Sequence, residues 1–533
     1  MDSLAGTRGL VRLILRRDRF LLPLWIVLFA LLPVQYAVAT DQLFPTVAAR
    51  QEYLDSIVAN PALLGLLGPV FNASLGALVT WRIGALLAIV GLVSLLTVIR
   101  HTRTEEEAGR RELLGATVVG RHAPLAAALG VTIGANLLLG ALLAAGMTGL
   151  DLPGTGSVAL GLSMAAAGCM FAAVGAVAAQ LTQSAGGARG VAIGALGGAF
   201  LLRAAGDSGG PDSRLGWLSW LSPLGWVQQA RPYAGERWWV YGLALGLVVA
   251  LAAVAFALLS RRDIGAGILP ARLGPATASP MLRSPLALAW RLHRGMLVGW
   301  TTGFAVAGAV IGSVAQTTTD MAADNAQLRD ILEQLGGQTA LADAYLAGTM
   351  GFLALAAAGY AVQATLRLRT EEEGLRAEPV LAAAVGRLRW AASHLAFGLL
   401  GPAVALVAFG LAAGLAYGLT TADVAGQLPR VLAGALVQLP AVWVLSGIAA
   451  ALFGLLPRLA AASWAALAVF ALLVLLGPLM ELRQWMLDLS PFTHTPKVPG
   501  GEVAATPLVW LLGVAAVLAA AGLAGFRRRD LVV

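Results

Sequence analysis

The sequence predicts an all-α polytopic membrane protein with about twelve transmembrane helices, arranged as two tandem six-span units in a parallel, non-inverted repeat. Three observations support this prediction. Hydrophobic residues account for 58% of the 533 positions and charged residues for 12%, a balance that soluble globular domains do not have. The apolar residues fall in runs of about 20, long enough to cross the hydrocarbon core as a helix. One segment also recurs in the second half of the chain.

The apolar runs are separated by charged residues or by glycine and proline. They lack the alternation of a transmembrane barrel, so each span is predicted to be a helix. The spans of the first half are expected at 20–40, 78–99, 122–148, 157–182, 189–206 and 238–259. Those of the second half are expected at 296–315, 346–366, 389–417, 430–456, 459–480 and 506–526.

The internal repeat is carried by an acidic segment. RTEEEAGRRELLGATVVGR at 103–121 aligns with RTEEEGLRAEPVLAAAVGR at 369–387, with 11 identities in 19 positions. Arg261-Arg262-Asp263 after the sixth span likewise matches Arg528-Arg529-Asp530 after the twelfth. Six spans are an even number, so both units begin and end on the same side of the membrane and the repeat is parallel.

These boundaries predict three parts of the chain. A stretch rich in glycine, proline and arginine, without a long apolar run, separates the two sets of spans and is predicted to be a cytoplasmic linker. The parts are a first six-span unit at 1–260, the linker at 261–284 and a second six-span unit at 285–533.

The arginines predict the orientation and the compartment. Most of the 36 basic residues border the spans on the side that holds both termini, and the positive-inside rule makes that side cytoplasmic. The chain is therefore expected to be a multi-pass protein of a bacterial cell membrane, with the lipid bilayer as its surroundings. The net charge of +8 follows the membrane boundaries and does not indicate a nucleic-acid partner.

The N-terminal residues 3–19 predict an amphipathic helix. Leu10, Leu13 and Ile14 share one helical face, and arginines at spacings of three and four share another. Such a helix would lie in the membrane interface. An equally good interpretation is that these arginines only fix the topology of the first span.

The three consecutive glutamates have a local explanation. Thr104 and Glu107 have the spacing of a capping box, and negative charge is favourable in the first turn of a helix. Glu106 and Arg110 would then form an i,i+4 pair, as would Glu107 and Arg111, and Glu372 and Arg376 in the second half. A short cytoplasmic helix ending near Gly115 is predicted. Capping does not explain why both halves carry the glutamates at the same place.

Each half is expected to contain the same elements in the same order: an interfacial helix, a span, a long outer loop, a second span and an acidic cytoplasmic helix. The acidic helix has the form E-x-x-x-G-x-x-x-L-L-x-x-x-x-x-x-R. This order resembles the permease subunit of ABC exporters of the type-2 class over the whole chain. The fused double unit is similar to actinobacterial permeases assigned to export of polyketide-type antibiotics and other drugs.

The resemblance implies a role for the acidic segments, because in that family the helix between the second and third spans is the coupling helix that docks onto the ATP-binding subunit. The second half departs from the pattern. Leu375, Pro379 and Val380 stand there in place of Gly109, Leu113 and Leu114, and proline kinks a helix. The coupling residues implied are Glu105, Glu106, Glu107, Arg110, Glu112, Glu371, Glu372, Glu373, Arg376 and Glu378.

ATP binding is not predicted for this chain. A P-loop requires G-x-x-x-x-G-K-[ST], and the one lysine, Lys497, stands in HTPKVPG. The chain is thus not expected to be an enzyme by itself or to bind a cofactor. ATP and magnesium would be bound by a separate P-loop subunit, with two copies expected for each permease chain.

Other catalytic or metal chemistry has little support. The five histidines are scattered without an H-E-x-x-H pattern, so no metal site is expected. GDSGG around Ser208 matches the serine-nucleophile form, but it lacks a strand–turn–helix setting and a histidine base, and a flexible loop explains it better. Charged residues are nearly missing inside the predicted spans, and Arg82 in the second span is an exception.

By family analogy, the substrate path would be lined by the second, fifth, eighth and eleventh spans. Ordinary packing also explains each residue proposed for it. The candidates are Phe200, Met350, Phe352, Tyr360, Trp464 and Phe470.

The function expected is that of the transmembrane subunit of an ATP-driven exporter of amphipathic or hydrophobic small molecules, such as antibiotics or drugs. A secondary transporter of the major-facilitator type is the main alternative, and it would be expected to have buried ionisable groups in its spans. A membrane-embedded lipid-modifying enzyme is a weaker alternative. A sensor or resistance module that moves no cargo remains open.

Overall fold

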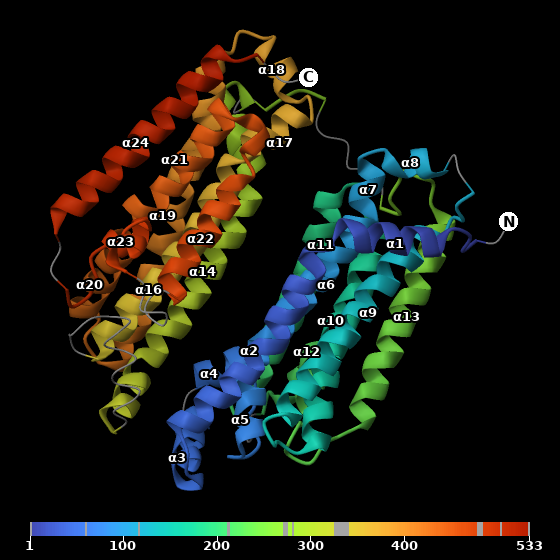
Figure 1. The fold of residues 1–533 in the computed structure, drawn as a ribbon, viewed down its shortest axis with the longest axis vertical. Coiled ribbons are helices and arrows are strands. Elements are labelled where there is room, and N and C mark those ends of the chain that lie inside the picture. The colour runs from blue at the N-terminus through green and yellow to red at the C-terminus, as the bar shows by residue number, and fades with distance from the viewer. Residues whose placement is uncertain are drawn as a thin grey trace. The chain divides into compact units, whose positions relative to one another are not determined.

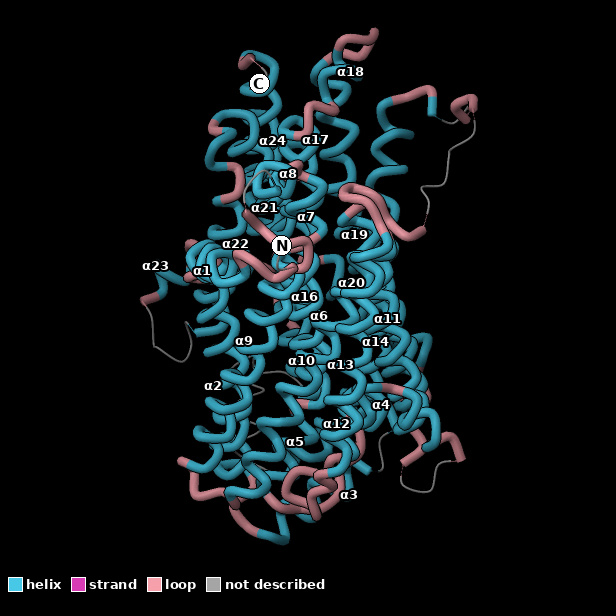
Figure 2. The backbone as a smooth tube through the Cα atoms, turned by 90° about the vertical axis from the view of Figure 1, so that its right-hand side faces the viewer, coloured by secondary structure: helices cyan, strands magenta, loops and turns pink. Residues whose placement is uncertain are grey.

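The computed structural model describes residues 3–58, 61–115, 118–210, 214–269, 276–279, 282–324, 341–476, 483–501 and 504–530. These residues contain helices and loops but no strand; in Figure 2 helices make up nearly all of the tube, and the loops mostly join their ends. Eleven of the helices are long and apolar enough to cross a membrane. The prediction of an all-α polytopic membrane protein is confirmed.

The chain forms two compact units, Met1–Gly274 and Pro275–Val533. The boundary between them falls within the predicted linker. Each unit has its own buried apolar core.

The first unit is built from long apolar helices that run side by side (Figure 1). α10 lies among them, in contact with α6, α9, α11 and α13. The long helices are α2 (Leu21–Leu43), α6 (Gly84–His101), α9 (Ala123–Thr148), α10 (Gly154–Leu181), α11 (Ala185–Asp207) and α13 (Trp239–Arg261).

Short helices complete the two ends of the first unit. At one end, α1 (Thr7–Arg17) lies across the ends of the long helices (Figure 1). The predicted amphipathic face is present in part, because Leu10 and Ile14 are buried, whereas Leu13 is 52% exposed. The acidic segment forms α7 (Arg103–Glu107) and α8 (Arg110–Gly115).

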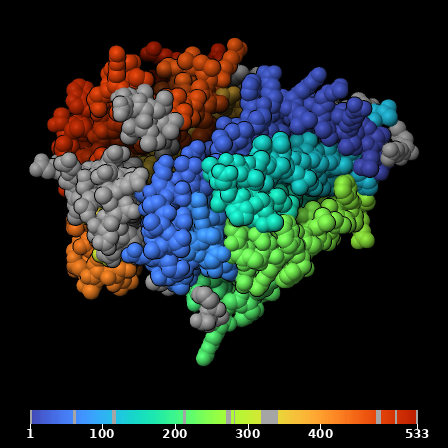
Figure 3. All heavy atoms as spheres, turned by 60° about the horizontal axis from the view of Figure 1, so that its bottom comes forward, coloured from blue at the N-terminus to red at the C-terminus, as the bar shows by residue number. Residues whose placement is uncertain are grey.

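At the other end of this unit, loops fold into further short helices. In Figure 3 the blue residues that lead from α2 toward α6 border teal and green residues of the same unit. The short helices at this end are α3 (Val47–Val58), α4 (Pro61–Leu67), α5 (Leu75–Arg82), η1 (Gly216–Leu221) and α12 (Pro223–Gln229).

The second unit has a similar set of helices. Its long helices are α14 (Pro285–Asp324), α16 (Leu341–Thr365), α19 (Arg387–Thr420), α20 (Val424–Leu436), α21 (Leu439–Leu455), α22 (Ala462–Leu476) and α24 (Ala505–Arg528). The short ones are α17 (Arg367–Glu373), α18 (Ala377–Leu381), η3 (Pro457–Leu459), α23 (Gln484–Leu487) and η4 (Pro491–His494).

Three predicted spans differ from single long helices. The span at 78–99 is divided between α5 and α6, and the span at 430–456 between α20 and α21. The span at 459–480 corresponds to α22, which is apolar but shorter than a full crossing within the described residues, and its last part lies outside them.

Small residues let helices approach closely in the first unit. A Cβ added to Gly140 of α9 or to Gly161 of α10 would collide with the carbonyl oxygen of the other glycine. Beside this contact, Asn136 Nδ2 donates to Ser94 Oγ of α6 at 3.0 Å. Close backbone contact and interhelical hydrogen bonds are the forces that hold helices together in lipid.

Candidate functional site: the acidic segments of the two units

The first acidic segment turns sharply between its two helices. Ala108 and Gly109 separate α7 from α8, and Gly109 has a φ of 70°, a conformation that glycine adopts at low cost because it has no Cβ. The prediction of one continuous helix is therefore wrong. The residues on the two sides of the turn do not share a helical register.

The predicted capping box is also wrong. Thr102, not Thr104, precedes α7, and its hydroxyl donates to the carbonyl of Val98 without capping the helix. Thr104 lies inside α7, where its hydroxyl accepts a hydrogen bond from Arg189 of α11. The motif fails because the helix begins two residues earlier than the box requires.

The ion pairs of the first segment are shifted by one residue from the prediction. Arg110 pairs with Glu105 and Arg111 with Glu106, each at an N–O distance of 2.9 Å. The expected pairs of Glu106 with Arg110 and of Glu107 with Arg111 are wrong. The turn between α7 and α8 brings together residues five apart instead of four.

The carboxylate of Glu106 lies among three guanidinium groups, and its side chain is 1% exposed. It forms a bidentate pair with Arg262 at 2.6 and 2.8 Å. Arg111 donates to it at 2.9 Å, Arg103 lies 3.4 Å away, and the N–H of Gly265 donates at 2.7 Å. Burial lowers the pKa of Arg111. A buried carboxylate is tolerated only with this degree of compensation.

Arg262 connects this carboxylate to the last long helix of the unit, because it directly follows the end of α13. Its Nε donates to Gln180 Oε1 at 2.8 Å. Arg103 donates to the carbonyl of Ala179 at 2.8 Å. The acidic segment is therefore held against the ends of both α10 and α13.

The neighbouring glutamates point to other helices. Glu105 pairs with Arg17 of α1. Glu107 accepts a hydrogen bond at 2.8 Å from the N–H of Ala185, the first residue of α11, where the helix dipole favours a negative charge. The three consecutive glutamates thus tie α7 to α1, α11 and the end of α13.

The second acidic segment contains the same bidentate pair. Glu372 binds the two terminal nitrogens of Arg529, both at 2.6 Å. Arg529 directly follows α24, and its guanidinium lies over the rings of Phe453 and Phe526 at 4.9 and 5.1 Å. In each unit, the middle glutamate therefore binds the arginine that follows the last long helix.

The other glutamates of the second segment bind arginines close to them in sequence. Glu371 pairs with Arg367 and with Arg376, both at 2.8 Å. Glu373 pairs with Arg369 at 2.6 Å. The first segment is thus joined by ion pairs and caps to three helices, whereas these three pairs stay within or directly beside the second segment.

The predicted coupling residues divide into a buried and an exposed group. Glu106, Glu371 and Glu372 are buried, and Glu105 is half-buried. The exposed residues are Glu107, Arg110, Glu112, Glu373, Arg376 and Glu378.

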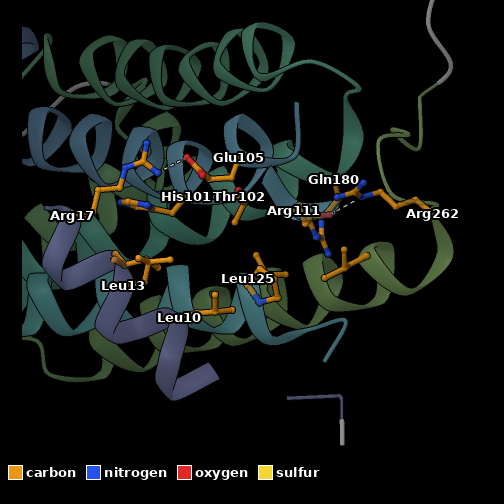
Figure 4. Close-up of a pocket in the computed structure, with 13 residues that line it drawn as sticks. Leu10, Leu13, Arg17, His101, Thr102, Glu105, Arg111, Leu125, Gln180 and Arg262 are labelled. Atoms are coloured by element: carbon orange, nitrogen blue, oxygen red, sulfur yellow. Dashed lines mark hydrogen bonds and ion pairs between the residues drawn. The ribbon is translucent and has the colours of Figure 1, made fainter. Parts of the chain in front are cut away.

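A cavity of about 70 Å³ adjoins the first segment beside α1. Figure 4 shows Leu10, Leu13 and Leu125 on one side of it, with Arg17 and Glu105 on the opposite side. An apolar wall facing a charged wall is the polarity expected where a helix lies at a membrane interface.

The ion-pair partners were missed by sequence reasoning, although a signal existed. In the internal repeat, Arg262 of the first half corresponds to Arg529 of the second, and Glu106 corresponds to Glu372. The two pairs of corresponding residues are separated by almost the same number of positions. That shared offset could have indicated that the two groups meet.

A buried charge inside a span was also missed. Arg203 of α11 is 1% exposed and donates to the carbonyls of Gly65 and Leu66 at 2.8 and 2.9 Å, while Asp207 lies 3.8 Å away. The expectation that the spans hold almost no charge is wrong here, because α4 supplies acceptors at the end of α11. The i,i+4 spacing of Arg203 and Asp207 was the available signal.

The six predicted path residues lie on three helices: Phe200 on α11, Met350, Phe352 and Tyr360 on α16, and Trp464 and Phe470 on α22. Met350 and Tyr360 are buried in the core of the second unit. Phe352 lines a cavity of that unit. The ring of Phe200 packs under the guanidinium of Arg203 at 4.6 Å. Their role in transport stays a prediction.

Apolar helices of membrane-crossing length, with ion-paired segments at their ends, define a polytopic membrane protein. The chain belongs to the multidrug efflux permease family. It is 49% identical over 530 residues to the "Multidrug efflux system permease protein Rv1217c" of Mycobacterium tuberculosis, covering 99% of this chain and 96% of that protein. The family described as "Multidrug efflux system permease Rv1217c, C-terminal domain" matches residues 282–527. The predicted resemblance to a drug-exporter permease is confirmed.

Proposed function

We propose that this chain is the transmembrane subunit of an ATP-driven ABC exporter that moves amphipathic or hydrophobic small molecules out of the cytoplasm or the inner leaflet. The name of its relative, a multidrug efflux system permease, supports the cargo class. The observation that carries the mechanism is the bidentate pair between the acidic segment and the last long helix, present as Glu106–Arg262 and as Glu372–Arg529.

Such a pair can transmit force between the two elements. A bidentate guanidinium–carboxylate contact fixes orientation as well as distance, and a pair protected from water keeps most of its strength. A push on the exposed side of α7 and α8 would therefore reach α13 through Glu106 and α11 through Glu107. Rigid-body movement of helices in this way is a common form of alternating access.

The driving force comes from a separate P-loop ATPase, with two copies for each permease chain and one beneath each acidic segment. ATP and magnesium are bound there, so this chain is not an enzyme by itself. The sequence has no P-loop motif. Both termini lie in the cytoplasm of a bacterial cell, on the same side as the acidic segments.

The exposed and buried residues have different tasks in this mechanism. The exposed residues Glu107, Arg110 and Glu112 contact the ATPase, together with Glu373 and Glu378 in the second unit. The buried glutamates pass the movement on. Burial of Glu106 and Glu372 argues against a direct contact of these two with a partner.

The two segments are not equivalent in this proposal. The first contacts α1, α11 and the end of α13 through its glutamates, whereas Glu371 and Glu373 bind arginines within or beside their own segment. The first segment therefore moves more of its unit for a given displacement.

The test is co-purification. The chain, tagged and extracted from its membrane in mild detergent, is expected to bring with it a P-loop ATPase at two copies per permease. Absence of any ATPase from the purified complex contradicts the proposal. A lower ratio, one ATPase for each chain, contradicts the two-segment arrangement only.

Secondary transport is the second candidate, because Arg203 and Asp207 are ionisable groups buried in a span. The contacts of Arg203 with backbone carbonyls favour a structural role. Transport in vesicles that contain ATP and both subunits should continue after addition of a proton uncoupler. Loss of transport under these conditions would support the secondary mechanism instead.

A further inference from the structure

A groove lies on the outside of the first unit, where α1 and α2 meet α9. α1 ends at Arg17 and α2 begins at Leu21, so the chain turns a corner between them (Figure 1). α9 packs against both helices. The groove has a volume of about 630 Å³, and side chains of all three helices line it. No residue of the acidic segment contributes to its walls.

Glycines of α9 leave the space of this groove open. Gly130 and Gly134 lie about one turn apart, and a Cβ added to either would meet no atom within 4 Å. When the alignment of the two acidic segments is continued without a gap, Ala396 and Leu400 of α19 stand at the corresponding positions. The second unit thus has a large side chain where the first has a glycine.

The groove is apolar along most of its length and has the dimensions of a lipid chain. Leu15 of α1, Ile26 of α2 and Leu138 of α9 form its walls together with other aliphatic side chains. From Gly130 to Leu142, α9 rises about 18 Å. The hydrocarbon core is about 30 Å thick, so one leaflet accounts for about 15 Å of it. The groove can therefore hold one acyl chain over the depth of one leaflet.

The corner end of the groove carries positive charge that no carboxylate balances. Arg19 lines the groove there, is exposed, and lies over the ring of Phe20 at 4.7 Å. Its guanidinium forms no ion pair with the residues that the structure describes. The same holds for Arg8, Arg12 and Arg16, which are exposed on α1.

The one acid that lines the groove does not oppose an anion. Asp18 is buried, and its carboxylate is bound by Arg100 at 3.0 Å and by His101 at 2.6 Å, both from α6. Arg17 is already paired with Glu105. Among the described residues at this corner, the charge that has no partner is therefore positive.

We propose that this groove binds one anionic phospholipid. One acyl chain lies along α9 over Gly130 and Gly134, and the headgroup phosphate lies against the guanidinium of Arg19. An amphipathic helix such as α1 lies at the level of the lipid headgroups, and exposed arginines at that level attract a headgroup of net negative charge. The binding involves the first unit alone and depends neither on an ATPase nor on the cargo.

The test is native mass spectrometry of the full chain in detergent, with one added molecule at a time. Phosphatidylglycerol and phosphatidylcholine with the same acyl chains differ in headgroup charge, and glycerophosphoglycerol has the anionic headgroup without the chains. Phosphatidylglycerol is expected to bind at least about fivefold more tightly than phosphatidylcholine, which is the factor that one basic residue supplies. Equal affinity of the two lipids overturns the proposal. Binding of glycerophosphoglycerol as tight as that of phosphatidylglycerol would indicate a free-phosphate site and overturns it too.

Two variants assign the parts of the lipid. Arg19→Gln should weaken phosphatidylglycerol about fivefold and phosphatidylcholine less than about twofold. Gly134→Leu places a side chain in the groove and should weaken both lipids at least about fivefold. Unchanged binding of phosphatidylglycerol in either variant contradicts the proposal. Arg19 is exposed, so its variant decides the question even if Gly134→Leu does not fold.

Matched controls lie outside the groove. Arg294→Gln removes the arginine of the second half that corresponds to Arg19 in the repeat, and this residue is also exposed. Gly246→Leu changes an exposed glycine of α13 whose added Cβ would meet no atom within 4 Å. Neither variant should alter lipid binding by more than about twofold. A loss in Arg294→Gln equal to that in Arg19→Gln would show unspecific attraction by surface charge and overturn the proposal.

The same spectra test a second copy of the chain as the occupant of the groove. If the chain is a dimer that Gly134→Leu converts to a monomer while lipid binding stays unchanged, the groove is a contact between copies and the proposal fails. Phosphatidylglycerol should also raise the thermal unfolding temperature of the unaltered chain more than that of Gly134→Leu, because a ligand stabilises only the state that binds it. An equal rise in both proteins would contradict binding in this groove.

Discussion

Glu106 and Arg262 form a bidentate ion pair across 156 positions of the sequence, with N–O distances of 2.6 and 2.8 Å. Glu372 and Arg529 form the same pair across 157 positions. In both units the pair joins the acidic segment to the end of the last long helix. In the function that we propose, this relationship gives the middle glutamates the task of transmitting movement instead of docking.

Removal of the Glu106 charge should destabilise the first unit. Glu106→Gln leaves Arg103, Arg111 and Arg262 without their shared carboxylate, and breaking a buried pair costs about 3–5 kcal/mol. Chemical unfolding in detergent should show this loss. The control is Glu373→Gln, whose pair lies at the surface and should cost at most about 1 kcal/mol. Equal small losses in both variants would contradict the structural role of Glu106.

Exchange of the partners should restore the second pair in part. Glu372→Arg and Arg529→Glu, each alone, place like charges together and should lower thermal stability and transport. The double variant restores opposite charges, so its interaction energy should be favourable by about 0.5–3 kcal/mol in a double-mutant cycle. Arg528→Glu, one residue away, replaces Arg529→Glu in a control cycle and should show no interaction with Glu372→Arg. A cycle energy of zero for the true pair argues against the contact.

Reversal of an exposed charge should affect the ATPase without affecting the fold. Glu112→Arg changes an exposed position of α8, so stability should change by no more than about 0.5 kcal/mol. Stimulation of the partner ATPase by cargo should fall at least about fivefold if this surface carries the coupling. Glu52→Arg, an exposed glutamate of α3, is the control and should retain stimulation. Normal stimulation of the ATPase in Glu112→Arg would contradict the assignment of this surface to ATPase coupling.

A methyl group at the glycine contact between α9 and α10 should separate these helices. In Gly161→Ala, the new Cβ meets the carbonyl oxygen of Gly140, and overpacking of this kind costs about 1–3 kcal/mol. Gly134→Ala on α9 meets no atom within 4 Å and should gain up to about 1 kcal/mol from better helix propensity. Thermal unfolding of the two variants measures the difference. A loss of stability in Gly134→Ala equal to that in Gly161→Ala would contradict close packing as the cause.

Local patterns predicted some features of the acidic segment and misplaced others. Sequence reasoning identified the segment and its charged residues, but it assigned Thr104 as the cap and paired Glu106 with Arg110. Both assignments assume one ideal helix through 104–115. Gly109 can turn the chain at low cost, but no local sequence pattern indicates that the chain turns there. Tertiary contacts with Arg189 and Arg262 select the turned form.

The sequence by itself determined that this protein is helical, spans a membrane many times and belongs with efflux permeases, because apolar length, charge at span ends and motif spacing are one-dimensional quantities. Only the tertiary structure decided that Glu106 points inward while Glu112 stays exposed. The direction of a side chain depends on where a helix begins and breaks. Its burial depends on partners such as Arg262, which are distant in sequence and meet it only after the helices have packed.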